Sequence, residues 1–324
     1  MLCLQISLPP HAPVDAGCPP LACPESPGHI PTGWELVALL KRNAPVGART
    51  EAKLSNCIMG ALDNPGGLFR AELGLRMAEA FGLCDSRSDS IACAVEYFHI
   101  ASLVLDDLPA MDDAMERRGR ICPHLLHGEG TAILAALGFI TRAYGLLGGA
   151  IARSPRQYQE AAHEYLERCL GTRGIVNGQA RDLASPKELH RRSSAAAVAL
   201  QKTVPLIALP LLLPALLAGG DARSLLLLRR LAVAWGLFYQ GVDDLTDILA
   251  SARLSGKTAG RDESLGRPNI ARRLGIAGAG RYLDRLIGIS EDSVARLAAI
   301  RPGLKFLTRF QRLVARRRDA LPIP

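Results

Sequence analysis

The chain has 324 residues, of which 48% are apolar, 22% charged and 5% aromatic, so it can bury a sizeable core and is not globally disordered. Its apolar residues are mainly Leu and Ala, which favour helices over a β-sandwich or barrel. The net charge is +8, but residues 301–324 carry seven basic residues and one acid, so 7 − 1 = +6 of it lies there. We interpret that run as a solvated helix face and expect no nucleic-acid partner, because aromatic residues are few and no recognised binding motif occurs.

The N-terminal region differs in composition from the rest. Residues 1–32 hold eight prolines and little periodic pattern, which predicts a disordered or loosely attached leader before one domain that spans residues 33–324. The start of the chain lacks the basic region of a signal peptide. Eight cysteines are scattered without a CxxC pair, which favours reduced thiols and a cytoplasmic location over a disulfide framework.

From residue 34 onward, Leu- and Ala-rich stretches predict helices, and no stretch alternates with a period of two. The predicted helical segments are 34–42, 50–62, 68–82, 88–106, 130–150, 156–178, 187–219, 222–251, 279–300 and 303–320. Gly and Pro residues separate these segments, and no repeat or linker divides them. We therefore predict a single all-α bundle of about ten helices around a central cavity. The most apolar run, residues 204–220, has three prolines and is shorter than the about 20 residues of a membrane span, so we expect a buried core helix and no span.

A first acidic cluster, Asp106-Asp107-Leu-Pro-Ala-Met-Asp112-Asp113, ends the apolar segment 91–105. Pro109 interrupts the helical spacing, so Asp106 and Asp112 share a face only if the helix opens there. Carboxylates crowded in an apolar wall have raised pKa values and need a cation to neutralise them. Hard oxygen ligands of this kind suit Mg²⁺, which is usually bound by one or two carboxylates together with substrate phosphates.

A second acidic cluster, Asp243-Asp244-Leu-Thr-Asp247, lies inside the segment 237–248. Asp243 and Asp247 are four residues apart and project from one helix face. One such cluster alone is explained equally well as a helix cap or as solvated charge. Two clusters on separate apolar segments favour a metal-binding site. Basic residues accompany the clusters: Arg70, Arg117, Arg118, Lys202 and Lys257. Carboxylates, magnesium and fixed Lys and Arg side chains together form a receptor for diphosphate.

At this point the sequence resembles a known family. Residues 95–113, followed by Arg117-Arg118-Gly119, resemble the first aspartate-rich motif of the trans-isoprenyl diphosphate synthases, and residues 238–247 resemble the second. Gly178-Gln179, Asp182-Leu183, Lys202-Thr203 and residues 256–262 match further signatures in the family's order, and the resemblance covers residues 35–310. It implies an isoprenoid-synthase fold and a prenyltransferase reaction. In that reaction an allylic diphosphate ionises to a carbocation, which isopentenyl diphosphate attacks head-to-tail.

The same resemblance implies a role for each matching residue. Metal binding falls to Asp106, Asp112 and Asp243, with Asp107 supporting and Asp244 and Asp247 acting through water, around three Mg²⁺ ions once substrate is bound. Arg117, Lys202 and Lys257 would hold the allylic diphosphate, and Arg70, His99 and Arg118 would hold isopentenyl diphosphate. Thr203 and Gln240 would line the reacting centre. The resemblance also implies a homodimer.

Three departures from the family pattern affect the expected activity. Gly67 stands where the family has Lys, and the loss of one cation predicts isopentenyl diphosphate binding weaker by about 1–3 kcal/mol. Leu105 often reads His in the family, and residues 136–139 read Ala-Leu-Gly-Phe instead of Gly-Asp-Ala-Leu. These changes leave open a weakly active regulatory subunit, although two complete aspartate motifs favour an enzyme. A terpene cyclase is disfavoured because cyclases typically carry a different second motif.

In this family the side chains just before the first aspartate motif set the product length. Ala101 and Ser102 are small, and Phe98 and Tyr97 lie a turn or two deeper, where either could stop a longer chain. We therefore predict geranylgeranyl diphosphate as the product, with farnesyl diphosphate as the alternative. Simple tight packing of the helix is a competing explanation for Ala101 and Ser102.

Overall fold

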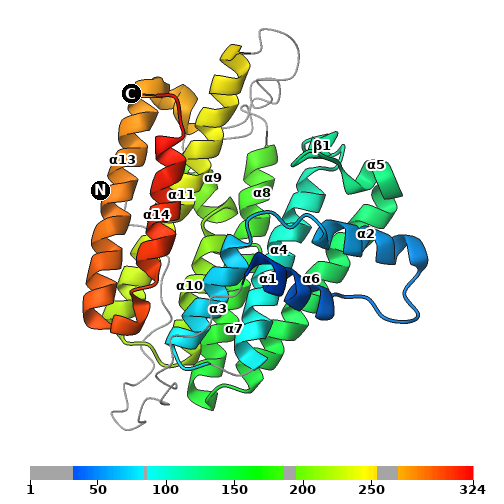
Figure 1. Cartoon of the computed structure of the whole chain (residues 1–324), viewed down its shortest axis with the longest axis horizontal. Helices are drawn as coiled ribbons and strands as arrows, with labels where there is room; N and C mark the ends of the chain where they lie inside the picture. The colour runs from blue at the N-terminus through cyan, green and yellow to red at the C-terminus, as the bar shows by residue number, and fades with distance from the viewer. Residues whose placement is uncertain (1–31, 84–85, 185–194, 254–268, 324) are drawn as a thin grey trace.

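The computed structural model of the chain describes residues 32–83, 86–184, 195–253 and 269–323, and these are almost entirely helical (Figure 1). The elements are α1 (Gly33–Arg42), α2 (Ala52–Leu62), α3 (Phe69–Ala80), α4 (Ser86–Asp106), β1 (Glu116–Arg117), β2 (Arg120–Ile121), α5 (Pro123–His127), α6 (Glu129–Ala152), α7 (Arg156–Leu170), α8 (Ile175–Leu183), α9 (Ala195–Lys202), α10 (Pro205–Leu217), α11 (Ala222–Arg253), α13 (Ile270–Ile300), the 3-10 turn η1 (Pro302–Leu304) and α14 (Leu307–Asp319). The predicted all-α class is confirmed. The predicted leader before residue 32 and the segment that contains Lys257 lie outside the described residues.

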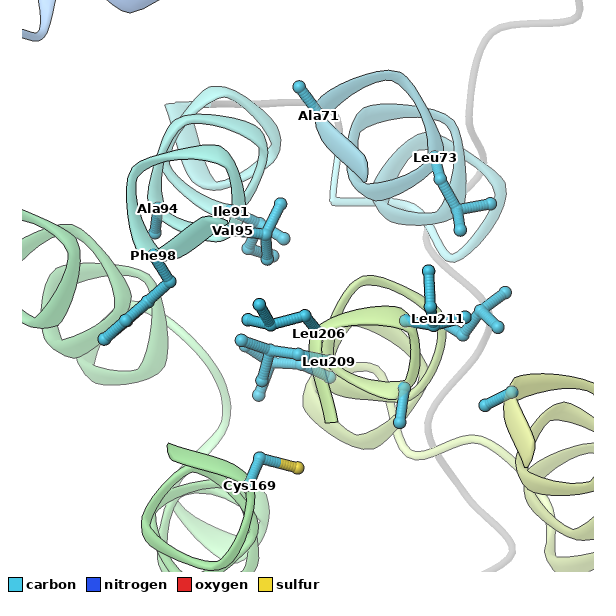
Figure 2. Packing of buried hydrophobic residues seen from close by; sticks show 14 of the residues in the cluster. Ala71, Leu73, Ile91, Ala94, Val95, Phe98, Cys169, Leu206, Leu209 and Leu211 are labelled. Carbon is cyan, nitrogen blue, oxygen red and sulfur yellow. The ribbon is translucent and has the colours of Figure 1, made fainter. Parts of the chain in front are cut away.

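Helix α10 is the centre of the bundle. Every residue from Pro205 to Leu217 is buried, which confirms the prediction of a core helix for this apolar run. Figure 2 shows Leu206, Leu209 and Leu211 of α10 packed between α3 and α4 on one side and α7 on the other. Pro205 occupies the first turn, where a missing N–H costs nothing, and α9 meets α10 there at an angle of 45°. Lys202 and Thr203 therefore lie at a bend beside the core.

Several predicted helices divide or extend in the structure, mostly at glycines. The segment predicted as 156–178 separates into α7 and α8, because a Cβ at Gly174 would lie 2.1 Å from the carbonyl oxygen of Cys169. Helix α13 begins at Ile270, earlier than predicted, where Asn269 caps it by accepting the Arg272 N–H at 2.9 Å. Gly275, with φ +69°, kinks the same helix. The bundle consequently has more helices than the ten predicted.

The first acidic cluster begins at the end of α4 and continues in the loop that follows it, and the second lies within the long helix α11. Helix α4 packs against α3 and α6, and α11 packs against α13 and α10. At the C-terminus α14 lies beside α13 and α11 (Figure 1). The last helix is thus placed against the helix that carries the second acidic cluster.

By length and composition alone, three helices of the described residues could cross a membrane: Ser86–Asp106, Glu129–Ala152 and the part of α11 from Ala222 to Leu249. The bent pair α9 and α10 would make a fourth if it were counted as one span. The apolar windows of the first and third are 72% and 67% buried inside the bundle. That of α6 is only 33% buried, so its apolar side chains form much of its outer face. The surface of α6 therefore differs from those of the other two helices.

Candidate active site

The end of α4 brings two carboxylates together. The chain turns back after Leu108, and the backbone N–H of Asp112 donates to the carbonyl of Asp106 at 2.9 Å. This loop, with Asp113 at φ +49°, solves the spacing problem that Pro109 creates. Burial raises the pKa of Asp106 to about 6, and the like charge of Asp112 adds to the shift while Lys202 opposes it. The end of α4 is therefore a place where a cation is electrostatically favoured.

Helices α8 and α9 supply the polar partners of Asp106. Gln179 Nε2 donates to Asp106 Oδ1 at 2.6 Å, and Lys202 Nζ lies 2.6 Å from Asp182 Oδ2 and 4.0 Å from Asp106 Oδ2. Burial alone lowers the pKa of Lys202, but Asp106 and Asp182 outweigh it and the pKa is raised. Lys202 is thus a fixed cation beside the first acidic cluster, as predicted. Gln179 and Asp182 belong to matched signatures, yet their part in the site was not predicted.

Asp107 faces away from this group and holds Arg117. Arg117 Nε donates to both oxygens of Asp107, at 2.8 and 2.9 Å, and Nη2 donates to Oδ1 at 2.6 Å. The side chain of Asp107 is 2% exposed and that of Arg117 is 35% exposed, so the carboxylate is buried beneath the guanidinium. Asp107 therefore positions Arg117, and its predicted supporting role in metal binding stays a prediction.

The second acidic cluster divides into two functions. Asp243 and Asp247 share a face of α11. The side chain of Asp243 is in contact with solvent, but the protein groups around it displace much of its water. This burial raises the pKa of Asp243, while Arg317 and Arg70 oppose the shift. Asp244 is instead buried, and its carboxylate accepts the Ile270 N–H at 2.6 Å. Asp244 therefore fastens α13 to α11 rather than facing solvent with Asp243.

Thr203 and Gln240, predicted at the reacting centre, are joined to this anchor. Thr203 Oγ1 donates to Gln240 Oε1 at 2.7 Å, and Gln240 Nε2 donates to Asp244 Oδ1 at 2.8 Å. The chain of hydrogen bonds runs from the α9–α10 bend across α11 to the start of α13. It fixes the amide of Gln240, so Thr203 is held by a side chain that cannot turn freely.

Arg70, His99 and Arg118, predicted to bind one diphosphate, lie close together around Glu96. The carboxylate of Glu96 is buried and accepts the Ala71 N–H at 3.1 Å, which ties the start of α3 to α4. Burial raises the pKa of Glu96, and Arg70 is the strongest opposing charge. Burial also lowers the pKa of His99 well below its usual range, and Arg70 and Arg118 lower it further. His99 is therefore a neutral imidazole among cations.

The position of Arg118 depends on a tight turn. Arg118 and Gly119 join β1 to β2 with φ of +53° and +72°, the pattern of a two-residue hairpin turn. The guanidinium reaches back to the loop before α3, where Nη1 donates to the Asn64 carbonyl at 3.2 Å. A Cβ on Gly66 would lie 2.4 Å from Arg118 Cζ, so this glycine is required for the contact. The hairpin and the glycine loop together form one wall of the site.

Arg317 of α14 was not predicted as a site residue. Its Cζ lies 4.7 Å from the ring centroid of Tyr239, one helical turn before Asp243 on α11. Arg317 is also the strongest of the charges that oppose the raised pKa of Asp243. The sequence marked it only as one of several C-terminal basic residues, and nothing in the local pattern separated it from its neighbours.

The residues proposed to set product length point in different directions. Ala101 is buried, Ser102 is half-buried, and Phe98 packs edge-on against Tyr144 of α6 at 5.1 Å. Tyr97 is fully buried, and its hydroxyl donates to the Leu40 carbonyl of α1 at 2.6 Å. That hydrogen bond points the Tyr97 hydroxyl toward α1, while the Tyr97 ring packs on Phe139 of α6 at 5.4 Å. The role of either ring in stopping chain growth stays a prediction.

A cavity of about 170 Å³ lies on the side of α4 that Asp107 faces. Its wall is formed by α2, α4, the β1–β2 hairpin and α5, and includes Asp107, Arg117 and Arg118 among apolar neighbours. The cavity therefore adjoins Arg117 and Arg118, two of the arginines predicted to bind diphosphate.

No group of three or more His, Cys, Asp or Glu side chains in the described ranges closes around a single metal position. The donors are instead two adjacent carboxylates, Asp106 and Asp112, together with Asp243 on another helix. Such a set fits a hard divalent cation that takes one or two carboxylates and completes its shell with phosphate oxygens. The residues present thus fit Mg²⁺ that binds together with a diphosphate.

Comparisons with known proteins agree with this geometry. The family model of polyprenyl synthetase matches residues 51–300. The heterodimeric geranylgeranyl pyrophosphate synthase large subunit 2 of Arabidopsis thaliana is 32% identical over 272 residues, which is 81% of this chain and 71% of that protein. The mitochondrial geranylgeranyl pyrophosphate synthase 6 of the same plant is 37% identical over 234 residues, or 68% of each chain. The geranyltransferase of Helicobacter pylori, solved with magnesium and isoprenyl diphosphate, superposes with a TM-score of 0.70 at 24% identity, covering 86% of this chain and 93% of its own.

Proposed function

This chain belongs to the polyprenyl synthetase family, and we propose that it joins isopentenyl diphosphate head-to-tail to an allylic diphosphate to give mainly geranylgeranyl diphosphate. One observation carries the proposal. The carboxylates at the end of α4, the fixed cation Lys202 and the cluster of Arg70, His99 and Arg118 gather around a single region that Asp243 of α11 also borders. This arrangement can hold two diphosphates at once, as the reaction requires.

The side chains divide the chemical work. Lys202 and Arg117 would hold the diphosphate that leaves the allylic substrate, and their fixed positive charge stabilises the negative charge that develops there. Asp106, Asp112 and Asp243 would hold Mg²⁺, which when bound adds positive charge to the departing diphosphate; we propose three ions. Arg70, His99 and Arg118 would orient isopentenyl diphosphate. The apolar side chains of the surrounding helices exclude water from the carbocation.

The product length follows from the residues one to two turns before Asp106. Ala101 leaves room for a tail that a bulky side chain would stop, and Phe98, whose ring packs on Tyr144 of α6, is the first Phe or Tyr before it on α4. The relatives named as geranylgeranyl pyrophosphate synthases support the same length.

The deciding experiment supplies the purified chain with Mg²⁺, labelled isopentenyl diphosphate and, in separate reactions, dimethylallyl, geranyl or farnesyl diphosphate. We expect geranylgeranyl diphosphate as the longest main product, and no product from an Asp243→Asn control. Products that end at farnesyl diphosphate would contradict the proposed length. The second candidate function is a weakly active regulatory subunit of a prenyl synthase, which Gly67 favours. It predicts no product from the chain alone.

We also propose that the chain forms a homodimer through α6. Ile133, Leu134, Leu137 and Tyr144 on this helix are 40–55% exposed and lie on its outer face. A continuous apolar face of this kind on a long helix is typical of an interface between subunits. A cytoplasmic location remains a prediction, which fractionation of cells that express the full chain would test.

A further inference from the structure

The diphosphate site around Arg70 lacks one of its expected cations. Gly67 occupies the position of the family's lysine, so Arg70, His99 and Arg118 are left with a neutral backbone where a fourth donor is expected. The Nε of Arg70 is buried and has no hydrogen-bond partner among the described residues. A buried guanidinium N–H without an acceptor is costly, which points to an anion that completes it.

The same loop fastens the last helix to the site. Phe69, the residue before Arg70, contacts three rings edge-on: Phe310 of α14 at 5.2 Å, Tyr239 at 5.5 Å and Trp235 at 5.8 Å. Edge-to-face contacts at these distances are favourable beyond the area they bury. Phe69 thus sits where α3, α11 and α14 meet, directly beside the residue that binds the diphosphate.

Two polar contacts fix how α14 lies on this cluster. Trp235 Nε1 donates to Gln311 Oε1 at 2.7 Å inside the bundle, and the guanidinium of Arg309 pairs with the carboxylate of Glu72 on α3. Together with the Phe69 contacts they hold α14 near its N-terminal end and its middle. The final turns of the helix are thereby directed toward Tyr239 and Asp243.

Arg317 lies on those final turns and differs from the basic residues around it. Arg309 pairs with Glu72 and Arg318 pairs with Asp284, whereas Arg317 makes neither a hydrogen bond nor an ion pair with any part of the chain that the structure describes. Its guanidinium lies over the Tyr239 ring at 4.7 Å, and its charge acts on Asp243, Arg70 and Arg118. It therefore offers unused donors next to two other arginines.

We propose that Arg317 binds the diphosphate of isopentenyl diphosphate in place of the lysine that is absent at Gly67, and that Phe69 positions it by docking α14. Arg70 and Arg317 carry like charges that the carboxylates of Glu96 and Asp243 offset in part, and a diphosphate bound between them would relieve their remaining repulsion. The inference rests on the proposed function and deepens it. The residue that supplies the missing cation comes from the far end of the sequence.

The test compares steady-state kinetics of the full-length wild type, Arg317→Gln, the matched control Arg316→Gln, and the double variant Arg317→Gln/Gly67→Lys. Arg316 is exposed, and its side chain has no hydrogen bond or ion pair within the described residues. A Cβ at Gly67 meets nothing within 4 Å, so a lysine fits there. We expect Arg317→Gln to raise KM for isopentenyl diphosphate about 10- to 100-fold, as loss of a charge-assisted hydrogen bond does. KM for the allylic substrate should change less than threefold, Arg316→Gln should match the wild type, and Gly67→Lys should restore most of the loss.

Failure of the proposed function and failure of the Arg317 assignment give different results. If wild type forms no product with any allylic primer, the proposed function fails, and calorimetric titration of isopentenyl diphosphate into wild type and Arg317→Gln still tests the inference. An unchanged KM for isopentenyl diphosphate, or equal increases for both substrates in a variant with wild-type thermal stability, overturns the assignment of Arg317. A raised KM that Gly67→Lys does not restore overturns the substitution for the missing lysine.

Discussion

Asp107 and Arg117 form a buried, three-bond ion pair in which the guanidinium covers the carboxylate, with N···O distances of 2.6 to 2.9 Å. Asp107 is adjacent to Asp106 in sequence but pairs with Arg117, whereas Asp106 accepts from Gln179 and lies near Lys202. The pair converts one carboxylate of the first acidic cluster into the support for a substrate-binding cation. Neighbouring aspartates of one motif thus do different work.

Asp107→Asn should therefore act on the allylic substrate. An amide has one acceptor oxygen and no charge where the carboxylate has two charged oxygens that both accept from Arg117, so Arg117 loses its fixed orientation. We expect KM for the allylic diphosphate to rise about tenfold, which corresponds to about 1.4 kcal/mol, with KM for isopentenyl diphosphate nearly unchanged. Asp113→Asn, in the same loop but exposed, is the control. Equal kinetics for the two variants would contradict the role given to Asp107.

The raised pKa of Asp106 predicts that this carboxylate lowers the stability of the fold at neutral pH, although the proposed function requires it. Its pKa is about 6 in the folded chain against an ordinary value of 3.8, because burial disfavours the charged form. The folded state then holds the proton more tightly than the unfolded state, so the free energy of unfolding falls as pH rises from about 4 to 6 and stays low above that. Two pKa units correspond to roughly 3 kcal/mol, an upper bound for this group.

We expect Asp106→Asn to be more stable than wild type at pH 7 without Mg²⁺, and the difference to shrink toward pH 4. The asparagine still accepts the hydrogen bond from Gln179, and Lys202 keeps its pair with Asp182. Urea unfolding at pH 4.5, 6 and 7.5 measures the effect, and synthase activity should be lost in the same variant. Lower stability of the variant at pH 7 would refute the argument.

Gly66 and Gly67 offer a matched pair of substitutions. Gly66 has φ +84° and its missing Cβ leaves room for the guanidinium of Arg118, whereas a Cβ at Gly67 meets nothing within 4 Å. Gly66→Ala should cost about 1–2 kcal/mol of stability and raise KM for isopentenyl diphosphate by displacing Arg118. Gly67→Ala should leave both quantities close to wild type. Thermal unfolding and kinetics of the two variants separate the backbone effect from the general loss of a glycine.

The sequence predicted those parts of the site that lie within one helix or directly follow it. Asp243 and Asp247 share a face because both lie in one uninterrupted helix, and Lys202 was located by its place before the apolar core run. The sequence does not predict the loop that brings Asp112 to Asp106, because its hydrogen bonds form only beyond the end of the helix. The C-terminal run was interpreted as solvated, which suits exposed Arg312 and Arg316.

The sequence did not predict Arg317 as a site residue, and the water-mediated metal role predicted for Asp244 did not include its contact with α13, because both contacts join distant segments. The ring that Arg317 covers belongs to α11, and the N–H that Asp244 accepts belongs to the start of α13. Tyr97 and Phe98 are adjacent in sequence, yet one hydrogen bond to Leu40 turns the first toward α1. Local spacing predicts which helix face a residue occupies, but not which neighbour covers that face.

Phe98→Ala should lengthen the product. The ring of Phe98 packs against Tyr144 between α4 and α6, and its removal opens space about one turn before Ala101. We expect products longer than geranylgeranyl diphosphate, with a stability cost of about 3–5 kcal/mol at most, as for other buried Phe to Ala changes. Tyr97→Phe, which removes only the hydroxyl bonded to Leu40, should keep the wild-type product. Chromatography of the dephosphorylated products distinguishes these outcomes, and an unchanged product from Phe98→Ala would remove this residue as the barrier.

The exposed face of α6 predicts how the homodimer is disrupted. Leu134 and Leu137 are 55% and 54% exposed, and in a dimer that covers α6 both would be removed from water. Each buried leucine contributes about 1.5–3 kcal/mol, so Leu134→Arg/Leu137→Arg should convert a dimer to a monomer at micromolar concentration. Leu226→Arg, on the exposed side of α11 at 59%, is the matched control and should stay dimeric. Light scattering after size-exclusion chromatography measures the mass, and circular dichroism confirms the fold. A double variant that keeps the wild-type mass would place the interface elsewhere than on α6.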